Sequence, residues 1–300
     1  MTTTLILTEK EGWHFKQLEQ SLKKYNHKVL SSCLSKMCIK IVNNKQMIYI
    51  KDKPCDDINN IIVRFIPGGS LEEIVFYLNI LKLFEQQGVN VINQASKIED
   101  TVDKLYTSIL LSENNIKTPN TYVFRSKTNA HSFLKKNMLN KQFIYKPLFG
   151  SQGDNIAIVS QPNDLDGINN PSNVYYFQDY LHNEINHDYR VLVFRKADKF
   201  KYYYMTRYGN SFINNISKGA SCLQEIINPK IIDLALKSSM LLGIDFCGVD
   251  IIQYNNEYYV IEVNSIPAWR GLQNVENENI SQSFVDFIIE GKGLRGVNIL

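Results

Sequence analysis

The stretch FCGVDIIQYNNEYYVIEVNS, from Phe246 to Ser265, is the most informative part of this 300-residue sequence. Two apolar runs lie on either side of an Asn-Asn pair, a pattern that predicts two β-strands joined by a turn. Within these runs stand three side chains that carry oxygen donors, Asp250, Glu262 and Asn264. Buried strands are mostly apolar, so these three residues need an explanation of their own.

The spacing of the three residues predicts a metal site. Glu262 and Asn264 are two residues apart on one strand, so their side chains point to the same face. A loop centred on Asn256 would place Asp250 directly opposite Glu262, with Cβ atoms about 5 Å apart. Two carboxylates this close repel each other unless a cation lies between them. Oxygen ligands favour Mg²⁺ shared with substrate phosphates, with Mn²⁺ as the alternative metal. The other interpretation, polar residues on a solvent-facing hairpin, is disfavoured because both faces of the hairpin are largely apolar.

Composition excludes several classes of protein. The chain is 44% hydrophobic, which is enough for a sizeable core, and its net charge of +3 is too small to indicate nucleic-acid binding. Its five cysteines are irregularly spaced and match neither a disulfide framework nor a zinc site. We see neither a signal-peptide pattern nor an apolar run of about 18 residues, so we expect a cytoplasmic protein without a membrane partner.

Apolar periodicity in the first 95 residues indicates a βαβ-type unit. A short strand is expected at Thr4–Thr8, followed by a helix over residues 13–25. A second helix, LEEIVFYLNILKLFEQQG, has Ser70 as its expected N-cap, and the run VNVIN after it is a further strand.

The rest of the chain predicts mostly antiparallel strands with a few helices. One amphipathic helix is expected over SKIEDTVDKLYTSILLSENN, residues 96–115. The fold class is therefore α/β in the broad sense, of the α+β type, with more than one lobe. We expect an N-terminal domain at 1–95, a central lobe with a glycine-loop lid at 96–182, and a C-terminal lobe with the metal site at 183–300.

Three further motifs are weak when each is taken alone. In YKPLFGSQGDNI, Lys146 precedes a glycine-bearing turn that could hold phosphate oxygens, although such turns are common. The run FQDYL, residues 177–181, is on its own more typical of an edge strand, and Lys104 is more typical of a solvated helix face.

Taken in order along the chain, these motifs resemble those of the ATP-grasp carboxylate–amine ligases, most closely the RimK-type α-L-glutamate ligases, over roughly residues 93–272. The resemblance extends further, through VRFIPGGSLEEIVFYLNIL and EVNSIPAWRGLQ, to a branch associated with tetrahydromethanopterin-type cofactors. It implies a βαβ-type pre-ATP-grasp domain, followed by two α+β lobes that bind ATP between them.

The resemblance also implies roles for individual residues. The implied ATP-binding residues are Lys104, Lys146, Ser151, Gln152, Gly153, Gln178, Asp179, Leu181, Asp188 and Asn215. The implied catalytic residues are Arg207 and Lys146, and the metal ligands are Asp250, Glu262 and Asn264. The residues expected to contact the substrate are Arg190, Lys218 and Arg270. Because Ile213 and Lys218 depart from the basic residues of many relatives, the identity of the substrates stays open.

The function implied is an ATP- and Mg²⁺-dependent ligase that adds L-glutamate to an acceptor carboxylate through an acyl phosphate. The acceptor is expected to be a tetrahydromethanopterin-type cofactor, with another small molecule or a protein tail as alternatives. Two other functions stay open: a kinase that phosphorylates a small-molecule hydroxyl, and a nucleotide-binding module without catalysis. Neither nucleic acid nor a membrane is an expected partner, and a homo-oligomer is left open.

Overall fold

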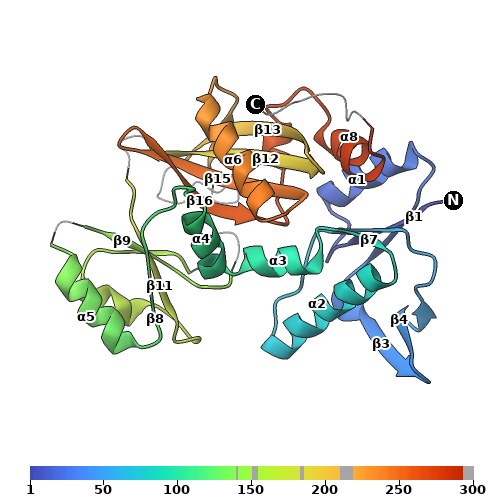
Figure 1. The fold of residues 1–300 in the computed structure, drawn as a ribbon, viewed down its shortest axis with the longest axis horizontal. Helices are drawn as coiled ribbons and strands as arrows, with labels where there is room; N and C mark the ends of the chain where they lie inside the picture. Colours follow the sequence, from blue (N-terminus) through green and yellow to red (C-terminus); the bar gives the residue numbers. More distant parts are fainter. Residues whose placement is uncertain (140, 151–154, 183–185, 210–218, 293–300) are drawn as a thin grey trace.

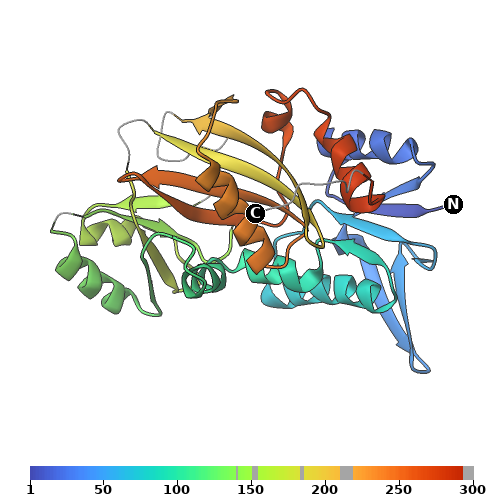
Figure 2. The same cartoon turned by 45° about the horizontal axis from the view of Figure 1, so that its top comes forward.

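The computed structural model describes residues 1–139, 141–150, 155–182, 186–209 and 219–292 (Figure 1). It has a mixed α/β architecture with separate sheets at its two ends and a third sheet between them (Figures 1 and 2). In this described part of the chain, each helix is too short or too polar to cross a bilayer.

The N-terminal region is a four-stranded parallel sheet with the order β2-β1-β6-β7. Its α2 begins with a capping box, because Ser70 and Glu73 each accept a backbone N–H of the other residue. The expected N-cap at Ser70 is therefore confirmed. The elements are β1 (Thr3–Leu7), α1 (Trp13–Lys23), β2 (Lys28–Ser32), β6 (Asn60–Val63), α2 (Leu71–Gln86) and β7 (Asn90–Ile92).

A small antiparallel sheet leaves this region as an insertion between β2 and β6. It was not predicted, and it projects away from the rest of the molecule (Figure 1). Its strands are β3 (Met37–Val42), β4 (Lys45–Ile50) and β5 (Lys53–Pro54).

The single helix expected over residues 96–115 is wrong, because two helices occupy this segment. They are α3 (Ala95–Val102) and α4 (Lys104–Glu113), and Asp103 separates them. The Asp103 carboxylate accepts the backbone N–H groups of Leu105 and Tyr106 at 2.9 and 3.0 Å. This N-cap starts a new helix, and it makes Lys104 the first residue of α4.

The central lobe is an antiparallel sheet with the order β10-β9-β11-β8. The interpretation of FQDYL as an edge strand is wrong, since β11 lies between β9 and β8. Helix α5, which was not predicted, lies beside this sheet (Figure 1). The elements are β8 (Thr121–Phe124), α5 (Lys127–Asn137), β9 (Phe143–Lys146), β10 (Ala157–Val159) and β11 (Tyr175–Asp179).

The C-terminal lobe is built on a five-stranded antiparallel sheet with the order β14-β13-β12-β15-β16. Helix α6 covers one face, where Ile231 and Ala235 pack on Val193 and Val249. The elements are β12 (His187–Lys196), β13 (Lys199–Tyr208), β14 (Ser221–Leu223), α6 (Pro229–Leu241), β15 (Phe246–Tyr254), β16 (Glu257–Asn264), α7 (Arg270–Gln273) and α8 (Ile280–Phe284), which continues into a π-helical turn at Val285–Ile289.

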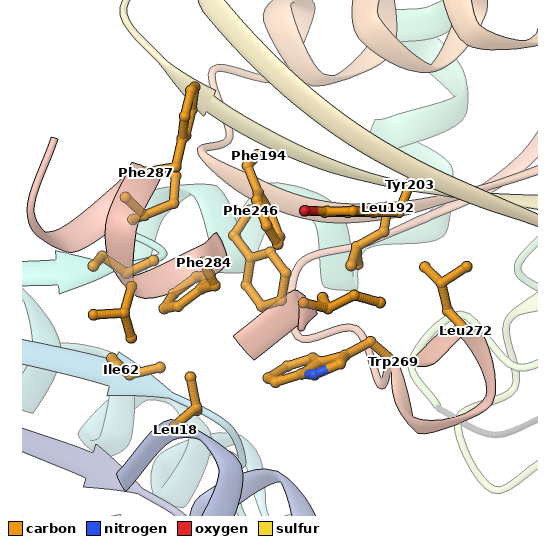
Figure 3. Packing of buried hydrophobic residues seen from close by; sticks show 14 of the residues in the cluster. Leu18, Ile62, Leu192, Phe194, Tyr203, Phe246, Trp269, Leu272, Phe284 and Phe287 are labelled. Carbon is orange, nitrogen blue, oxygen red and sulfur yellow. The ribbon is translucent and has the colours of Figure 1, made fainter. Parts of the chain in front are cut away.

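An aromatic core joins the other face of this sheet to the N-terminal region (Figure 3). Phe194 and Phe246 lie opposite each other on β12 and β15 and pack against Phe284. Leu18 and Ile62 enter the same core from the N-terminal region. Each of these fully buried side chains contributes about 1.5–3 kcal/mol, so the interface is a structural core of the protein.

A buried amide reinforces this junction. Asn93 is 3% exposed, and its Nδ2 donates to the carbonyl oxygens of Phe246 and Ser265, both at 2.6 Å. Its Oδ1 accepts the backbone N–H of Phe246 at 2.9 Å. The side chain therefore bonds to both strands of the terminal hairpin from the end of β7.

We predict that Asn93→Ala destabilises the whole protein by about 2–4 kcal/mol, because it leaves buried backbone groups of Phe246 and Ser265 without partners. Urea unfolding measures this loss. The matched control is Asn137→Ala, which removes an exposed amide from α5 and should change stability by less than about 0.5 kcal/mol. Equal losses in both variants would contradict the assigned role of Asn93.

Candidate functional site

The terminal hairpin places the predicted metal ligands on one face of the sheet, but its turn differs from the expected loop. Asp250 pairs with Glu262, as predicted, and Gly248 pairs with Asn264. The expected loop centred on Asn256 is wrong: Asn255 and Asn256 form a two-residue turn with φ values of 48° and 61°.

A β-bulge reconciles this turn with the observed pairing. From Tyr254–Glu257 to Ile251–Val260 the register follows the two-residue turn, and it then shifts by one residue between Ile251 and Asp250. The extra residue in β16 is Ile261. Without this bulge, Glu262 would point to the opposite face of the sheet, away from Asp250.

Four charged side chains form a buried network on this face. Arg190 binds both oxygens of Asp250, with Nη2 to Oδ2 at 2.7 Å, and lies directly across the strand pair from it. Arg207 binds both oxygens of Asp188 at 2.6 and 2.9 Å and also contacts Asp250 at 3.1 Å. Each carboxylate therefore has a guanidinium partner, which offsets the cost of burying it.

These arginines keep Asp250 ionised. Burial by itself would raise the pKa of Asp250, but the charges and hydrogen bonds of Arg190 and Arg207 outweigh it and hold that pKa below its ordinary value. A carboxylate that stays ionised can bind a cation at neutral pH.

Gly248 leaves room for this arrangement. A Cβ atom at position 248 would lie 3.0 Å from Nη1 of Arg190 and 3.0 Å from Cβ of Pro267. A side chain there would displace the guanidinium that binds Asp250, so the small residue next to Asn264 has a steric cause.

Lys146, at the end of β9, points toward the same region. Its Nζ donates to Oε1 of Gln178 at 2.7 Å, and Nε2 of Gln178 donates to Oγ1 of Thr121 at 3.2 Å. Burial lowers the pKa of Lys146 to about 8, a shift opposed by the negative charge of Glu262 and increased by the positive charge of Lys104. Gln178 thus positions the lysine, a role that the sequence did not suggest.

Lys104 approaches from the other side. Its Nζ donates to the carbonyl oxygens of Gly150 at 3.0 Å and Leu148 at 3.5 Å. Burial lowers its pKa, and Glu262 acts against this shift. Two cations and the Glu262 carboxylate therefore gather beside the glycine-bearing turn. Lys104 does not lie on a solvated helix face.

An open cleft of about 570 Å³ lies between the central and C-terminal lobes. Apolar side chains from both lobes form part of its walls and suit a flat ring. One end of the cleft is polar. The lining residues are Pro119, Ile144, Lys146, Gln178, Asp179, Tyr180, Leu181, His182, Asn186, His187, Asp188, Ile252 and Ile261. A smaller hollow beside it contains Lys104 and Glu262, and Ile261 lines both.

The donor set fits a divalent cation. Among the described residues, no three His, Cys, Asp or Glu side chains gather as a metal cluster. Asp250 uses Oδ1 for two arginines and Oδ2 for one, so Oδ2 retains a free acceptor direction. Glu262 and Asn264 add oxygens from the same face. Three protein oxygens are fewer than a divalent cation requires, which leaves positions for phosphate oxygens.

Several predicted site residues are not part of this arrangement. Arg270 is exposed at the start of α7, outside the residues that line the cleft. Asp179 does line the cleft; its carboxylate accepts from Asn120 at 2.7 Å, and its Oδ1 is buried without a hydrogen-bond partner in the described structure. The following residues lie outside the described residues: Ser151, Gln152, Gly153, Ile213, Asn215 and Lys218.

Sequence reasoning missed the apolar lining of the cleft. Ile144 follows ordinary strand alternation, and Ile252 and Ile261 looked like hairpin core. The bulge at Ile261 had no sequence signal that we recognised. The Gln178–Lys146 hydrogen bond could have been suspected from two polar residues on neighbouring strands.

Comparison with known proteins identifies two matching families of domains. The RimK pre-ATP-grasp domain matches residues 1–98, and the RimK-like ATP-grasp domain matches residues 101–288. The ATP-grasp fold implies binding of ATP and of a divalent metal in general.

Relatives with known activities are ligases. Tetrahydromethanopterin:alpha-L-glutamate ligase of Methanocaldococcus jannaschii is 29% identical over 72% of this chain and 75% of its own length. Alpha-aminoadipate–LysW ligase LysX of Saccharolobus solfataricus is also 29% identical, over 68% of this chain and 76% of its own.

Solved structures show the same fold at low sequence identity. The ATP-grasp ligase PsnB in complex with a minimal precursor has a TM-score of 0.72 at 16% identity, covering 97% of this chain and 99% of that one. A RimK domain ATP-grasp protein from Sphaerobacter thermophilus also reaches 0.72, at 14% identity, over 95% and 99% of the two chains. The chain therefore belongs to the RimK-like ATP-grasp family, whose members are ATP-dependent ligases that form C–N bonds.

Proposed function

We propose that the protein adds L-glutamate to an acceptor carboxylate, with ATP and Mg²⁺, through an acyl-phosphate intermediate. The observation that carries this proposal is a group of charges beside the interlobe cleft: Lys146 lines the cleft, Lys104 and Glu262 line the adjoining hollow, and Lys104, Glu262 and Asp250 all act on the charge of Lys146. Two cations and two carboxylates in this arrangement suit a nucleoside triphosphate with its metal ion.

The apolar part of the cleft would hold the adenine ring. Ile144 from the central lobe and Ile252 and Ile261 from the hairpin line it, and residues 178–182 form its rim. Asp188 lies deeper, fixed by Arg207. In the proposed complex, the ring lies between the two lobes and the phosphates extend toward Lys146.

The reaction has two steps. An acceptor carboxylate oxygen attacks the γ-phosphorus of ATP, the bond to the β–γ bridging oxygen breaks, and ADP leaves. The amine of the amino acid then attacks the acyl carbon, phosphate leaves, and the amine loses a proton. Lys146, Lys104 and Arg207 would stabilise negative charge on the phosphates, which is the main requirement of phosphoryl transfer.

Asp250, Glu262 and Asn264 would hold the metal. When bound, Mg²⁺ supplies charge neutralisation and orientation at the phosphates. Arg190 and Arg207 would keep the Asp250 oxygen in place for this task, since they fix the carboxylate in one orientation. The three oxygen ligands also accommodate Mn²⁺.

The acceptor is proposed to be a tetrahydromethanopterin-type cofactor or a related small molecule with a terminal carboxylate. The 29% identity to a tetrahydromethanopterin ligase supports it, but the equal identity to a ligase that acts on LysW also supports a protein tail. We further propose a division into domains at 1–95, 96–182 and 183–300, with the cleft between the second and the third.

The first test follows the products. The protein is incubated with ATP, Mg²⁺, L-glutamate and a small-molecule extract of the organism that encodes it, and masses are recorded. A species heavier by one glutamyl unit, formed together with ADP, is the expected result. A phosphorylated product without an amide would replace the proposal with the kinase alternative, and nucleotide binding without any product would favour the non-catalytic module.

We predict that Glu262→Ala lowers product formation by at least about 100-fold, because it removes a metal ligand that neutralises phosphate charge. Thermal unfolding should change little, since the Glu262 side chain forms no hydrogen bond or ion pair within the described residues and its backbone pairing in β16 is kept. Glu257→Ala, an exposed change on the same hairpin, is the matched control and should retain activity. Comparable turnover in both variants would refute the metal-site assignment.

We predict that the affinity for ADP·Mg²⁺ falls as the pH rises above 8. The pKa of Lys146 is lowered to about 8 in the free protein, so above this pH the amine is neutral and must take up a proton to bind phosphate. The dissociation constant should rise by roughly 10-fold per pH unit. In Lys146→Arg the side chain stays charged, so titration calorimetry at pH 7 and 9.5 should show a flatter profile. A steep profile in that variant would exclude Lys146 as its source.

A further inference from the structure

The order in which strands are added to the N-terminal parallel sheet reverses next to β1. Its strand order places β2 on one side of β1 and β6 on the other, so the connections that follow β1 and β6 diverge. In open α/β sheets, ligands bind at the carboxyl ends of strands where the order reverses in this way. The residue just beyond the carboxyl end of β6 is Arg64, whose backbone N–H donates to Leu7 of β1 at 2.8 Å.

Arg64 has a partly buried guanidinium that pairs with no anion among the described residues. Its Nε and Nη1 are buried and have no hydrogen-bond partner in the described structure. Desolvation lowers the pKa of this side chain to about 9, and no carboxylate of the described residues opposes the shift. An uncompensated buried guanidinium is costly, so its retention suggests an anionic partner that is absent from the free protein. Nη2 is not among the buried nitrogens, so a carboxylate can approach from that edge.

Aromatic rings hold Arg64 in place. Its guanidinium carbon lies 4.5 Å from the centre of the Trp269 ring and 5.9 Å from that of Phe246. Both rings belong to the core in Figure 3, so the cation rests on a rigid wall. A planar donor held in this way is preorganised for a carboxylate.

Two further groups are coupled to this site, because the charges of Arg64 and Arg270 both act on His14. His14 accepts the backbone N–H of Trp269 through Nε2 at 3.1 Å. Burial and the charges of Arg64 and Arg270 lower the pKa of His14 to about 3, so the ring is neutral and Nδ1 carries its proton. Arg270, next to Trp269, supplies a second positive charge. Two positive charges therefore act on His14.

The position relative to the phosphate site is set by β15. Phe246, Gly248 and Asp250 alternate on one face of this strand, and Asp250 is four residues from Phe246. At about 3.3 Å per residue, the Cα atom of Phe246, whose ring contacts Arg64, lies about 13 Å along β15 from the Cα atom of Asp250. This separation is too long for contact with a phosphate bound at Asp250.

We infer that Arg64, with Arg270 and the Nδ1–H of His14, forms a subsite for a substrate carboxylate remote from the reacting carbon. The inference rests on the proposed function and adds the recognition of a second carboxylate to it. A carboxylate that reaches Nη2 of Arg64 forms a charge-assisted hydrogen bond with it, and the charge of Arg270 adds to the attraction. Its source is either the incoming dicarboxylic amino acid or a glutamyl-terminated acceptor.

The test uses Arg64→Met in the full chain, because methionine keeps the apolar packing on Trp269 and removes the charge. Binding is followed by thermal shift and calorimetry in the presence of ADP and Mg²⁺. One probe is L-glutamate, which represents the amino acid. The other is N-acetyl-L-glutamate, which has no free amine and represents the acceptor. Arg125→Met, an exposed arginine of the central lobe, is the matched control for charge.

The expected result is that one probe binds wild type and the control but binds Arg64→Met about 10- to 150-fold more weakly, the loss expected for a charge-assisted hydrogen bond. The probe that shows this loss identifies the source of the carboxylate. Arg270→Met should weaken the same probe to a smaller extent. Arg64→Met should be at least as stable as wild type, since it removes a desolvated charge.

Other outcomes overturn the inference. The subsite is refuted if neither probe binds the wild type. It is also refuted if both probes bind Arg64→Met with the same affinity as the wild type. A fall in stability without a change in probe affinity would show a structural cation–π contact instead. The dissociation constant of ADP·Mg²⁺ separates the two proposals: it should be unchanged in Arg64→Met, whereas a wild-type protein that fails to bind ADP·Mg²⁺ contradicts the proposed function itself.

Discussion

The ion pair between Arg190 and the buried carboxylate of Asp250 is the interaction on which the candidate site depends. A carboxylate that is 3% exposed would be strongly unfavourable without it, because desolvation of a single charge costs several kcal/mol. The pair forms directly across two strands, β12 and β15, and its geometry requires the missing side chain of Gly248. Arg207 then links Asp250 to Asp188, so each of the four charges is fixed by its neighbours.

This network occupies half of one sheet face, and the aromatic core occupies the other half. Along β15, Phe246 belongs to the core and Asp250 to the charged half, with Gly248 between them. The core fixes the N-terminal region against the sheet, and Asn93 adds hydrogen bonds to the same hairpin (Figure 3). The arrangement makes the sheet a rigid platform, which suits a site whose ligands must keep their positions.

Local sequence patterns predicted most elements and the pairing of the terminal hairpin correctly. The alternation in FCGVDIIQYNNEYYVIEVNS was enough to predict the hairpin and the pairing of Asp250 with Glu262. The predicted pairing was right although the predicted turn was not, because the bulge at Ile261 compensated for the shorter turn. Two other errors were local. Asp103 caps a second helix where apolar periodicity runs on without a break, and the neighbours of β11 on both sides come from distant segments. Periodicity carries no information on either point.

The sequence by itself determined the class of fold, the residue types of the charged group beside the cleft, and the resemblance to a family of ligases. These follow from side-chain alternation and from the order of motifs, both of which are local. Only the tertiary structure decided which groups meet: Arg190 with Asp250, Gln178 with Lys146, and Arg64 with two aromatic rings and, among the described residues, no anion. The physical reason is that the pKa of a buried charge and its cost depend on the surrounding groups, which are brought together by strand order and packing across long stretches of the chain.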